Sequence, residues 1–271
     1  MILEVENISF SYDNSRPIFD GISFDVDSGQ VLTILGRNGI GKSTLIKCIL
    51  NILEFSEGRV RLMGEDVRHL GPSRIAAYAG YVPQTHNVVF PFSVFEFVLM
   101  GRAPHISVFR TPKKEDYRIT AQALDKIGIS HLADKTIAEI SGGERQMAMI
   151  ARVIAQDPRI LIFDEPTSHL DLANQVKVLS VIEMLSQEGI SVIMSTHFPD
   201  HGFLLSQRIA IMQHGRIVAQ GESEEVLTPG NLREAYGIEI DVCYVHEAGR
   251  RVCVPRFNGN GTCCGPGCST H

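Results

Sequence analysis

A glycine-rich stretch carries the strongest chemical signal in the chain. It consists of Gly36, Arg37, Asn38, Gly39, Ile40, Gly41, Lys42, Ser43 and Thr44. This order fits the pattern G-x-x-x-x-G-K-[ST], in which the glycines let backbone N–H groups converge on phosphate oxygens. Lys42 adds a compact cation, and Ser43 offers a hydroxyl to Mg²⁺. The stretch predicts a loop that binds nucleotide phosphates; the alternative is a glycine-rich turn with no ligand.

Two adjacent carboxylates follow an apolar run later in the chain. Residues 160–163 are Ile-Leu-Ile-Phe, and Asp164 and Glu165 come directly after them. A buried strand has little reason to end in paired acids unless a cation or a proton needs them. We expect Asp164 to hold Mg²⁺, directly or through water, and Glu165 to polarise an attacking water. A simple turn or helix start is the alternative, and Pro166 would fit it.

The elements that must position these residues are strands alternating with helices. Strands are predicted at residues 3–10, 18–26, 31–35, 58–64, 159–163 and 191–196, with a hairpin formed by 209–212 and 216–219. Helices are predicted at 42–53, within 91–138, and from Gly142 to Pro158. The alternation predicts an α/β sheet with a mainly helical insertion near residues 86–140. It also places the glycine-rich stretch between a strand and a helix, as a phosphate loop requires.

Composition limits the classes of function. The chain has 271 residues, 44% of them hydrophobic and 21% charged, which is typical of a globular protein. A net charge of −6 argues against a dedicated nucleic-acid binder. The most apolar stretch, residues 88–100, contains Pro91 and Glu96 and is too short to span a bilayer. The first residues alternate and lack a basic start, so no signal peptide is expected. We expect a cytoplasmic chain that reaches a membrane only through a partner.

The cysteines are concentrated at the end of the chain. Cys48 falls in a predicted core helix, and the others are Cys243, Cys253, Cys263, Cys264 and Cys268. In a reducing cytoplasm this favours metal binding over disulfides. Cys263, Cys264 and Cys268, with His271, could bind a soft metal, joined by Cys243 and Cys253 if the tail folds back. The composition of residues 258–271 gives more support to the alternative of a flexible Gly/Cys-rich tail.

The motif that suggests a family is the sequence Ser-Gly-Gly-Glu-Arg-Gln at residues 141–146. It resembles the LSGGQ signature of ATP-binding-cassette (ABC) ATPases, with Ile140 in place of the Leu and Glu144 in place of the Gln. Ser141 is a good N-cap, and Gly142 and Gly143 expose backbone N–H groups at a helix start. The motif therefore predicts a second anion site; the alternative is an ordinary capped helix.

Four further residues occur in the order that this family shows. The resemblance implies that Tyr12 stacks on adenine and that Gln84 reaches Mg²⁺ and the water. It implies that Asp171, in the sequence Ser-His-Leu-Asp, contacts an opposing subunit, and that His197 contacts the γ-phosphate. Packing for Tyr12 and a structural or solvated role for His197 are the alternatives.

The resemblance covers residues 1–257 and implies the P-loop NTPase fold of ABC type. That fold has a RecA-like core, an N-terminal antiparallel β-subdomain and a helical lobe at about 86–157 within an ATPase domain of residues 1–240. Residues 241–257 would be closing strands of the same domain. The resemblance also implies Mg²⁺-ATP and a head-to-tail homodimer with two shared sites. One chain would supply Gly36–Thr44, Gln84, Asp164, Glu165 and His197, and the other Ser141, Gly142, Gly143, Glu144 and Asp171.

One stretch narrows the resemblance further. Residues 92–105, 109–112 and 116–117 are similar to type II importers of iron-siderophores, haem and cobalamin, and residues 236–238 and 251–255 resemble their closing strands. This implies the ATPase subunit of an importer at the cytoplasmic face of the membrane. Its partners would be permease subunits and, indirectly, a substrate-binding protein. Val98 and Leu99 could equally meet the permease or pack inside the lobe. A soluble ABC ATPase without transport, or the ATPase of an efflux system, remains the alternative.

Overall fold

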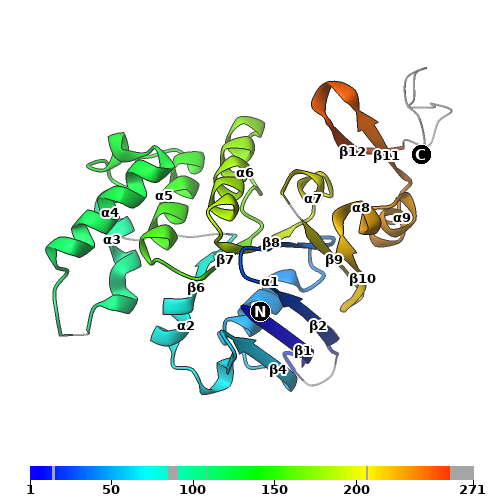
Figure 1. Ribbon diagram of the computed structural model, residues 1–271, viewed down its shortest axis with the longest axis horizontal. Helices are drawn as coiled ribbons and strands as arrows, with labels where there is room; N and C mark the ends of the chain where they lie inside the picture. The colour runs from blue at the N-terminus through cyan, green and yellow to red at the C-terminus, as the bar shows by residue number, and fades with distance from the viewer. Residues whose placement is uncertain (14–15, 85–90, 108, 206, 257–271) are drawn as a thin grey trace.

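The computed structural model describes residues 1–13, 16–84, 91–107, 109–205 and 207–256. Three sheets organise them (Figure 1). The N-terminal sheet has the order β2-β1-β4-β5 and is antiparallel throughout. Its strands are β1 (Leu3–Phe10), β2 (Phe19–Val26), β4 (Glu57–Leu62) and β5 (Glu65–Asp66). The predicted antiparallel subdomain at the start of the chain is confirmed.

The central sheet has the order β10-β9-β3-β8-β7-β6, and all its strands except β10 run parallel. The strands are β3 (Val31–Leu35), β6 (Ala79–Val82), β7 (Ile160–Asp164), β8 (Ser191–Thr196), β9 (Arg208–Gln213) and β10 (Arg216–Glu222). Every residue of β3, β7 and β8 is buried, which explains why these strands are mostly apolar. The predicted hairpin is confirmed as β9–β10.

A helical lobe lies to one side of the central sheet (Figure 1). It contains α3 (Val94–Leu99), η2 (Met100–His105), α4 (Lys114–Ile127), η3 (Ser130–Leu132) and α5 (Gly142–Ala155), while α2 (Pro72–Tyr78) precedes it. Val98 is fully buried in the apolar interior of this lobe. Leu99, its neighbour, is only partly buried and borders a surface groove. Packing inside the lobe is therefore confirmed for Val98, whereas Leu99 remains accessible to a partner.

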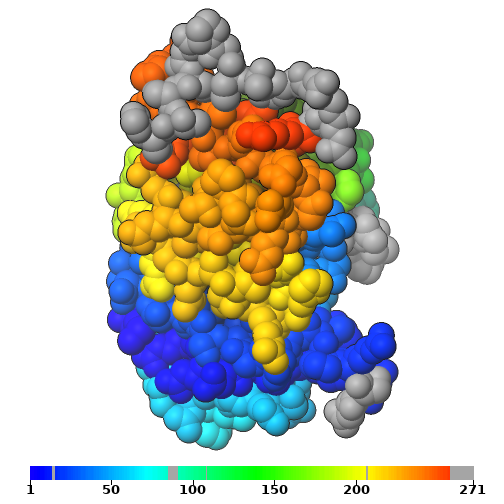
Figure 2. Space-filling view, turned by 90° about the vertical axis from the view of Figure 1, so that its right-hand side faces the viewer, coloured from blue at the N-terminus to red at the C-terminus, as the bar shows by residue number. Residues whose placement is uncertain are grey.

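Helix α6 (Leu172–Gln187) lies beside α5 (Figure 1), and its buried side chains belong to the apolar cluster of the lobe. Helix α7 (Asp200–Leu205) follows β8. The C-terminal region, on the flank of the sheet opposite the lobe, comprises α8 (Ser223–Val226), α9 (Pro229–Tyr236), β11 (Ile240–Val245), η4 (His246–Ala248) and β12 (Arg250–Pro255). Figure 2 shows the orange surface of α8 and α9 between the yellow β9–β10 segment and the redder hairpin β11–β12.

The hairpin changes the interpretation of its two cysteines. Cys253 pairs with Val242, and Cys243 pairs with Val252. Directly opposed residues share a face, so the two thiols leave opposite faces of the ribbon. They therefore do not form one ligand pair. Within the described residues no group of three His, Cys, Asp or Glu side chains could hold a metal, and Cys263, Cys264, Cys268 and His271 lie outside those residues.

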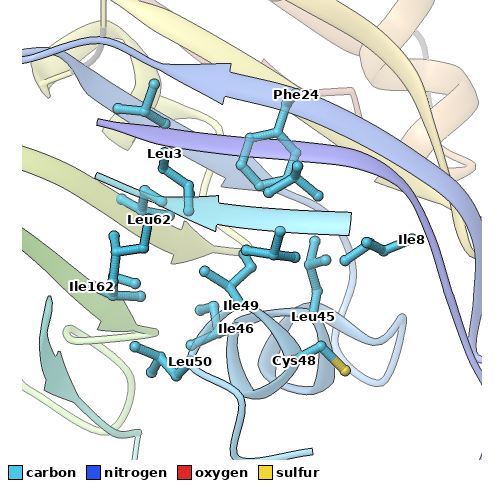
Figure 3. Packing of buried hydrophobic residues seen from close by; sticks show 14 of the residues in the cluster. Leu3, Ile8, Phe24, Leu45, Ile46, Cys48, Ile49, Leu50, Leu62 and Ile162 are labelled. Carbon is cyan, nitrogen blue, oxygen red and sulfur yellow. The ribbon is translucent and has the colours of Figure 1, made fainter. Parts of the chain in front are cut away.

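Helix α1 (Lys42–Ile49) is packed against the inner face of the N-terminal sheet (Figure 3). Leu45, Ile46 and Ile49 are buried with Leu3 and Leu62 in one apolar cluster. The prediction that this helix continues to residue 53 is wrong. At Asn51 the backbone turns to a φ of 53°, and its side-chain amide donates to the Val67 carbonyl at 3.1 Å. A left-handed residue ends a helix, and the bond to Val67 stabilises this turn. The core thus anchors the helix that follows the glycine-rich loop.

No helix in the described part of the chain is long and apolar enough to cross a membrane.

Candidate nucleotide-binding site

The glycine-rich loop joins the end of β3 to the start of α1, as the sequence predicts. Gly41 has a φ of 106°, and an added Cβ would lie 2.8 Å from Ile18 Cγ2, so only glycine suits this position. Lys42 is 3% exposed, and its ammonium donates to the carbonyls of Gly36 at 2.7 Å and Arg37 at 3.0 Å. The loop therefore curls around the lysine head group and holds its charge in place.

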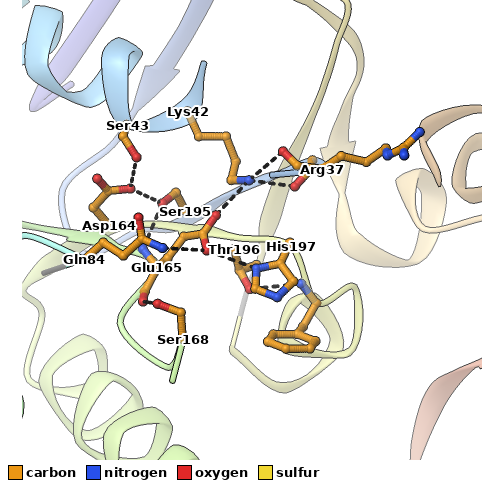
Figure 4. Close-up of polar contacts among 12 residues, drawn as sticks. Arg37, Lys42, Ser43, Gln84, Asp164, Glu165, Ser168, Ser195, Thr196 and His197 are labelled. Atoms are coloured by element: carbon orange, nitrogen blue, oxygen red, sulfur yellow. Dashed lines mark hydrogen bonds and ion pairs between the residues drawn. The ribbon is translucent and has the colours of Figure 1, made fainter. Parts of the chain in front are cut away.

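The two acids lie beside this lysine, buried at the end of β7 (Figure 4). Asp164 is 2% exposed, and its Oδ1 accepts hydrogen bonds from the hydroxyls of Ser43 at 2.9 Å and Ser195 at 2.8 Å. Glu165 is 7% exposed, and its Oε1 is 2.9 Å from Lys42 Nζ. Adjacent carboxylates thus point to different partners, one toward hydroxyls and one toward a cation.

Two further predicted residues reach Glu165 from other strands. His197 follows β8, and its Nδ1 is 3.0 Å from Glu165 Oε2. Gln84 follows β6, and its side-chain amide is 3.5 Å from the same oxygen, at the limit of hydrogen bonding. The carboxyl ends of β6, β7 and β8 are neighbours in the parallel sheet, which brings these residues together.

The structure adds two partners of Asp164 that sequence reasoning missed. Ser195 pairs with Asp164 in the register of β7 and β8, and its hydroxyl also accepts from the Glu165 N–H at 3.0 Å. The Tyr81 hydroxyl donates to Asp164 Oδ2 at 3.4 Å. Burial and the Asp164 carboxylate raise the pKa of Tyr81, so it stays a donor. Their only sequence signal is a polar residue near the end of a strand that neighbours β7.

A cavity of about 380 Å³ lies over the loop. It is lined by Tyr12, Ile18, Asn38, Gly39, Gly41, Lys42, Ser43, Thr44, Gln84 and Glu165. Tyr12 is 65% exposed, and its hydroxyl is 3.4 Å from Thr44 Oγ1. Its ring also meets Phe10 edge-on. Tyr12 therefore packs locally and still offers an aromatic surface at the edge of the cavity.

The signature residues form a different surface. Ser141 caps α5 through a capping box with Glu144. A Cβ on Gly143 would lie 2.4 Å from Asn174 Cγ, so this glycine permits close contact with α6. Asp171 caps α6 by accepting from the Asn174 N–H at 2.8 Å. Among the described residues that line the cavity over the phosphate loop, none comes from 141–144 or is Asp171.

The sequence is similar to those of known proteins. The family described as ABC transporter matches residues 19–168. The molybdate import ATP-binding protein MolC of Haemophilus influenzae is 36% identical over 231 residues, covering 85% of this chain and 86% of that protein. The iron(3+)-hydroxamate import ATP-binding protein FhuC of Bacillus subtilis is 32% identical over 253 residues, covering 93% and 94%.

A solved structure of a metal-chelate type ABC transporter in an inward-facing conformation is also similar. It superposes with a TM-score of 0.84 at 33% identity, covering 95% of this chain and 98% of that chain. The predicted fold class is thereby confirmed. The chain belongs to the ABC transporter family and is one of its ATP-binding, ATP-hydrolysing proteins.

Proposed function

We propose that this chain hydrolyses ATP to power import of a metal chelate through a separate membrane permease. The observation that carries the chemistry is the position of Glu165. One oxygen of its carboxylate is 2.9 Å from Lys42 Nζ, and the other is 3.0 Å from His197 Nδ1. A phosphate-loop lysine, a buried acid and a histidine at one point suit hydrolysis of a terminal phosphate.

In the proposed reaction Glu165 accepts a proton from the attacking water. The water oxygen bonds to the γ-phosphorus, and the bond to the bridging β-phosphate oxygen breaks. Lys42 binds the phosphates, which compete with Glu165 for its ammonium and so free one carboxylate oxygen for the water. His197 is close enough to Glu165 to hold the orientation of the carboxylate and to contact the γ-phosphate. Tyr12 would stack on the adenine from the edge of the cavity.

The oxygen donors at Ser43 and Asp164 fit a Mg²⁺ ion. Their side chains already converge, with Ser43 Oγ 2.9 Å from Asp164 Oδ1, and hydroxyl and carboxylate oxygens are the ligands that Mg²⁺ prefers. Gln84 lies beside them at the mouth of the cavity. Bound with ATP, the ion would neutralise charge on the phosphate oxygens.

We infer that a second copy of the chain completes the site. The capped start of α5 is formed by Ser141, Gly142, Gly143 and Glu144. Gly143 packs against Asn174, whose N–H donates to Asp171, so Asp171 lies near this helix start. This surface is suited to a γ-phosphate but belongs to another part of the chain. A head-to-tail pair would bring it over the phosphate loop of the partner.

A groove on the helical lobe is the proposed contact with the permease. It has a volume of about 430 Å³ and is lined by Glu96, Leu99, Met100, Ala103, Ile106, Ser107, Arg110 and Pro112. Met100 is 38% exposed, which leaves an apolar side chain at the surface. These residues belong to the stretch that resembles metal-chelate importers. Contact here would place the chain at the cytoplasmic face of the membrane, with a substrate-binding protein as an indirect partner.

The named relatives support import over the alternatives. MolC and FhuC are import ATP-binding proteins, and so is the hemin import ATP-binding protein HmuV of Nocardia farcinica, which is 34% identical over 245 residues. Each is covered over most of its length, as expected for a chain of the same kind. All three names favour import over efflux or a soluble role, and those of FhuC and HmuV favour an iron chelate as the cargo, whereas that of MolC names molybdate.

Replacing Glu165 with Gln tests the proposed chemistry. The amide cannot take the proton, so the ATPase rate should fall by about 100-fold or more while ATP binding is kept. Glu183→Gln makes the same replacement of a carboxylate by an amide at an exposed position on α6, and this control should keep the wild-type rate. A Glu165→Gln protein with full turnover would rule out the proposed base.

Replacing Met100 with Asp tests the proposed docking groove. Purification of the chain with its permease should fail, because a charge would be buried in an apolar contact, while basal ATPase activity stays unchanged. Met63→Asp is the control and places the same charge between β4 and β5 of the N-terminal sheet. Met63 is 42% exposed and Met100 is 38% exposed, so the two sites are similarly accessible. That control should co-purify normally; equal recovery of both variants would contradict the assignment of the groove.

A further inference from the structure

The C-terminal region contacts the backbone of the proposed γ-phosphate histidine. Tyr236, the last residue of α9, donates a hydrogen bond from its hydroxyl to the His197 carbonyl at 2.9 Å. Burial raises the pKa of Tyr236, with smaller contributions from Cys253 and from the Glu165 carboxylate. The phenol therefore remains a donor at neutral pH. A residue at the end of a peripheral helix thus bonds directly to the segment that carries His197.

A second bond joins the hairpin to the same segment. The backbone N–H of Cys253 on β12 donates to Asp200 Oδ1 at 2.8 Å. Asp200 begins α7, directly beyond His197, Phe198 and Pro199. The segment from 197 to 200 is therefore bonded at both ends to residues of the C-terminal region. The two bonding residues are themselves held, because Tyr236 and Cys253 pack against the apolar cluster formed by β9, α8 and α9.

The inner side of this segment is also fixed. Thr196 Oγ1 accepts from the Phe198 N–H at 3.1 Å and is 3.0 Å from His201 Nδ1. The Phe198 ring lies between the two histidines, with centroids 4.0 Å from His197 and 5.2 Å from His201. With the backbone held from both sides, the direction of the His197 ring depends on these bonds.

We propose that Tyr236 and the β11–β12 hairpin form a positioning element for His197, which sets the distance of its ring from Glu165 and from the γ-phosphate. The inference rests on the proposed role of His197 in hydrolysis. A displacement of about 1 Å at a reacting group can cost about 100-fold in rate, so one lost bond on the backbone carbonyl has a measurable effect. Tyr236 is not among the described residues that line the cavity over the phosphate loop, so it is a positioning residue.

Tyr236→Phe removes only the hydroxyl and keeps the packing of the ring. The turnover number should fall by about tenfold, while KM for ATP changes by less than about twofold, because the phosphate loop is untouched. Tyr244→Phe is the matched control. Tyr244 lies on β11 of the hairpin, is 46% exposed and meets the His246 ring edge-on, and loss of its hydroxyl should leave both constants unchanged.

The decisive experiment combines Tyr236→Phe with His197→Ala and measures steady-state ATPase rates of all four proteins. If Tyr236 acts through His197, its replacement should have little effect once His197 is gone. An equal loss in both backgrounds, or an unchanged rate of the single Tyr236→Phe variant, would overturn the positioning role while leaving the proposed chemistry intact. A His197→Ala protein with full activity would instead refute the role of His197 in the proposed function.

Discussion

The helix starts at α1 and α5 both expose glycine-rich backbone, yet they are built in opposite ways. At α1 the N-cap is Gly41, which offers no side-chain hydrogen bond, and the first helical residue is the buried Lys42. At α5 the N-cap is Ser141, whose hydroxyl accepts from the Glu144 N–H while Glu144 accepts from the Ser141 N–H. Ser141 is exposed.

This difference indicates what each helix start requires. The N–H groups at α1 are left for a ligand, and its charges are already held by buried partners. The start of α5 satisfies its own cap and is stable without a ligand. This difference supports the proposal that the first helix start binds ATP within one chain and the second meets the ATP of a partner chain.

Lys42→Ala should have the largest effect, on the α1 side. Removing one member of a buried charge pair leaves Glu165 without its cation and should cost roughly 3–5 kcal/mol of the free energy of unfolding. ATP affinity should fall by about 100-fold or more. Denaturant unfolding and nucleotide titration measure both. Lys47→Ala, on the same helix, is the control; a Lys42→Ala protein of normal stability and affinity would contradict the account.

Acid should lower the stability of the fold through His201, which is buried beside Thr196 at the end of β8. Burial lowers the pKa of His201 to about 4, with His197 adding to the shift, whereas an unfolded histidine titrates near 6.5. The unfolded chain thus binds the proton first, and stability is lost as pH falls from about 6.5 to about 4, by roughly 3 kcal/mol. His201→Gln keeps a partner for Thr196 but cannot titrate.

The measurement for His201 is the free energy of unfolding at neutral and at mildly acidic pH. The wild-type chain should lose more stability between the two than His201→Gln does. Identical losses would show that His201 does not enter the folded state neutral.

Ser141→Arg should affect the α5 side alone. The bulky cation would block the surface that meets the partner's nucleotide, so the ATPase rate should fall by about 100-fold, or roughly 2.7 kcal/mol in barrier. ATP affinity of the single chain should be unchanged, unlike that of Lys42→Ala. Ser130→Arg puts the same charge at another exposed serine of the lobe and should be silent. Weaker ATP binding in Ser141→Arg would erase the contrast.

Gly143→Ala should have the smallest effect. Its new methyl group would lie 2.4 Å from Asn174 Cγ, so the Asn174 side chain or the start of α5 must shift. We expect about a tenfold lower ATPase rate, roughly 1.4 kcal/mol. Adding Asn174→Ala removes the clash and should restore part of the rate. If Gly143→Ala is fully active, the contact between the two helices does not position the signature.

The sequence predicted most of the framework, because the relevant signals are local. The mostly apolar sequences of β3, β7 and β8 predict buried parallel strands. Polar residues that follow such strands meet at one edge of the sheet. The resemblance to ABC ATPases, added to this strand pattern, grouped Asp164, Glu165 and His197 before any coordinates. The length of α1 was overestimated, since apolar spacing continues past the left-handed turn at Asn51.

The contacts that escaped prediction join residues distant in the chain. Ser195 reaches Asp164 through strand register, and Tyr236 reaches His197 by the packing of α9 on the core. Neither residue belongs to a pattern of spacing, so only the folded chain reveals them. The same holds for the opposite faces of Cys243 and Cys253, which depend on how the hairpin pairs.

The most direct test of the central claim is the oligomeric state of the Glu165→Gln protein with ATP. Without turnover, ATP should remain bound between the phosphate loop of one copy and the signature of the other. Analytical ultracentrifugation should then show a dimer with ATP and a monomer without it. The double variant with Ser141→Arg should still bind ATP but stay monomeric. A Glu165→Gln protein that binds ATP and remains a monomer, or a dimer that Ser141→Arg does not disturb, would contradict the shared site.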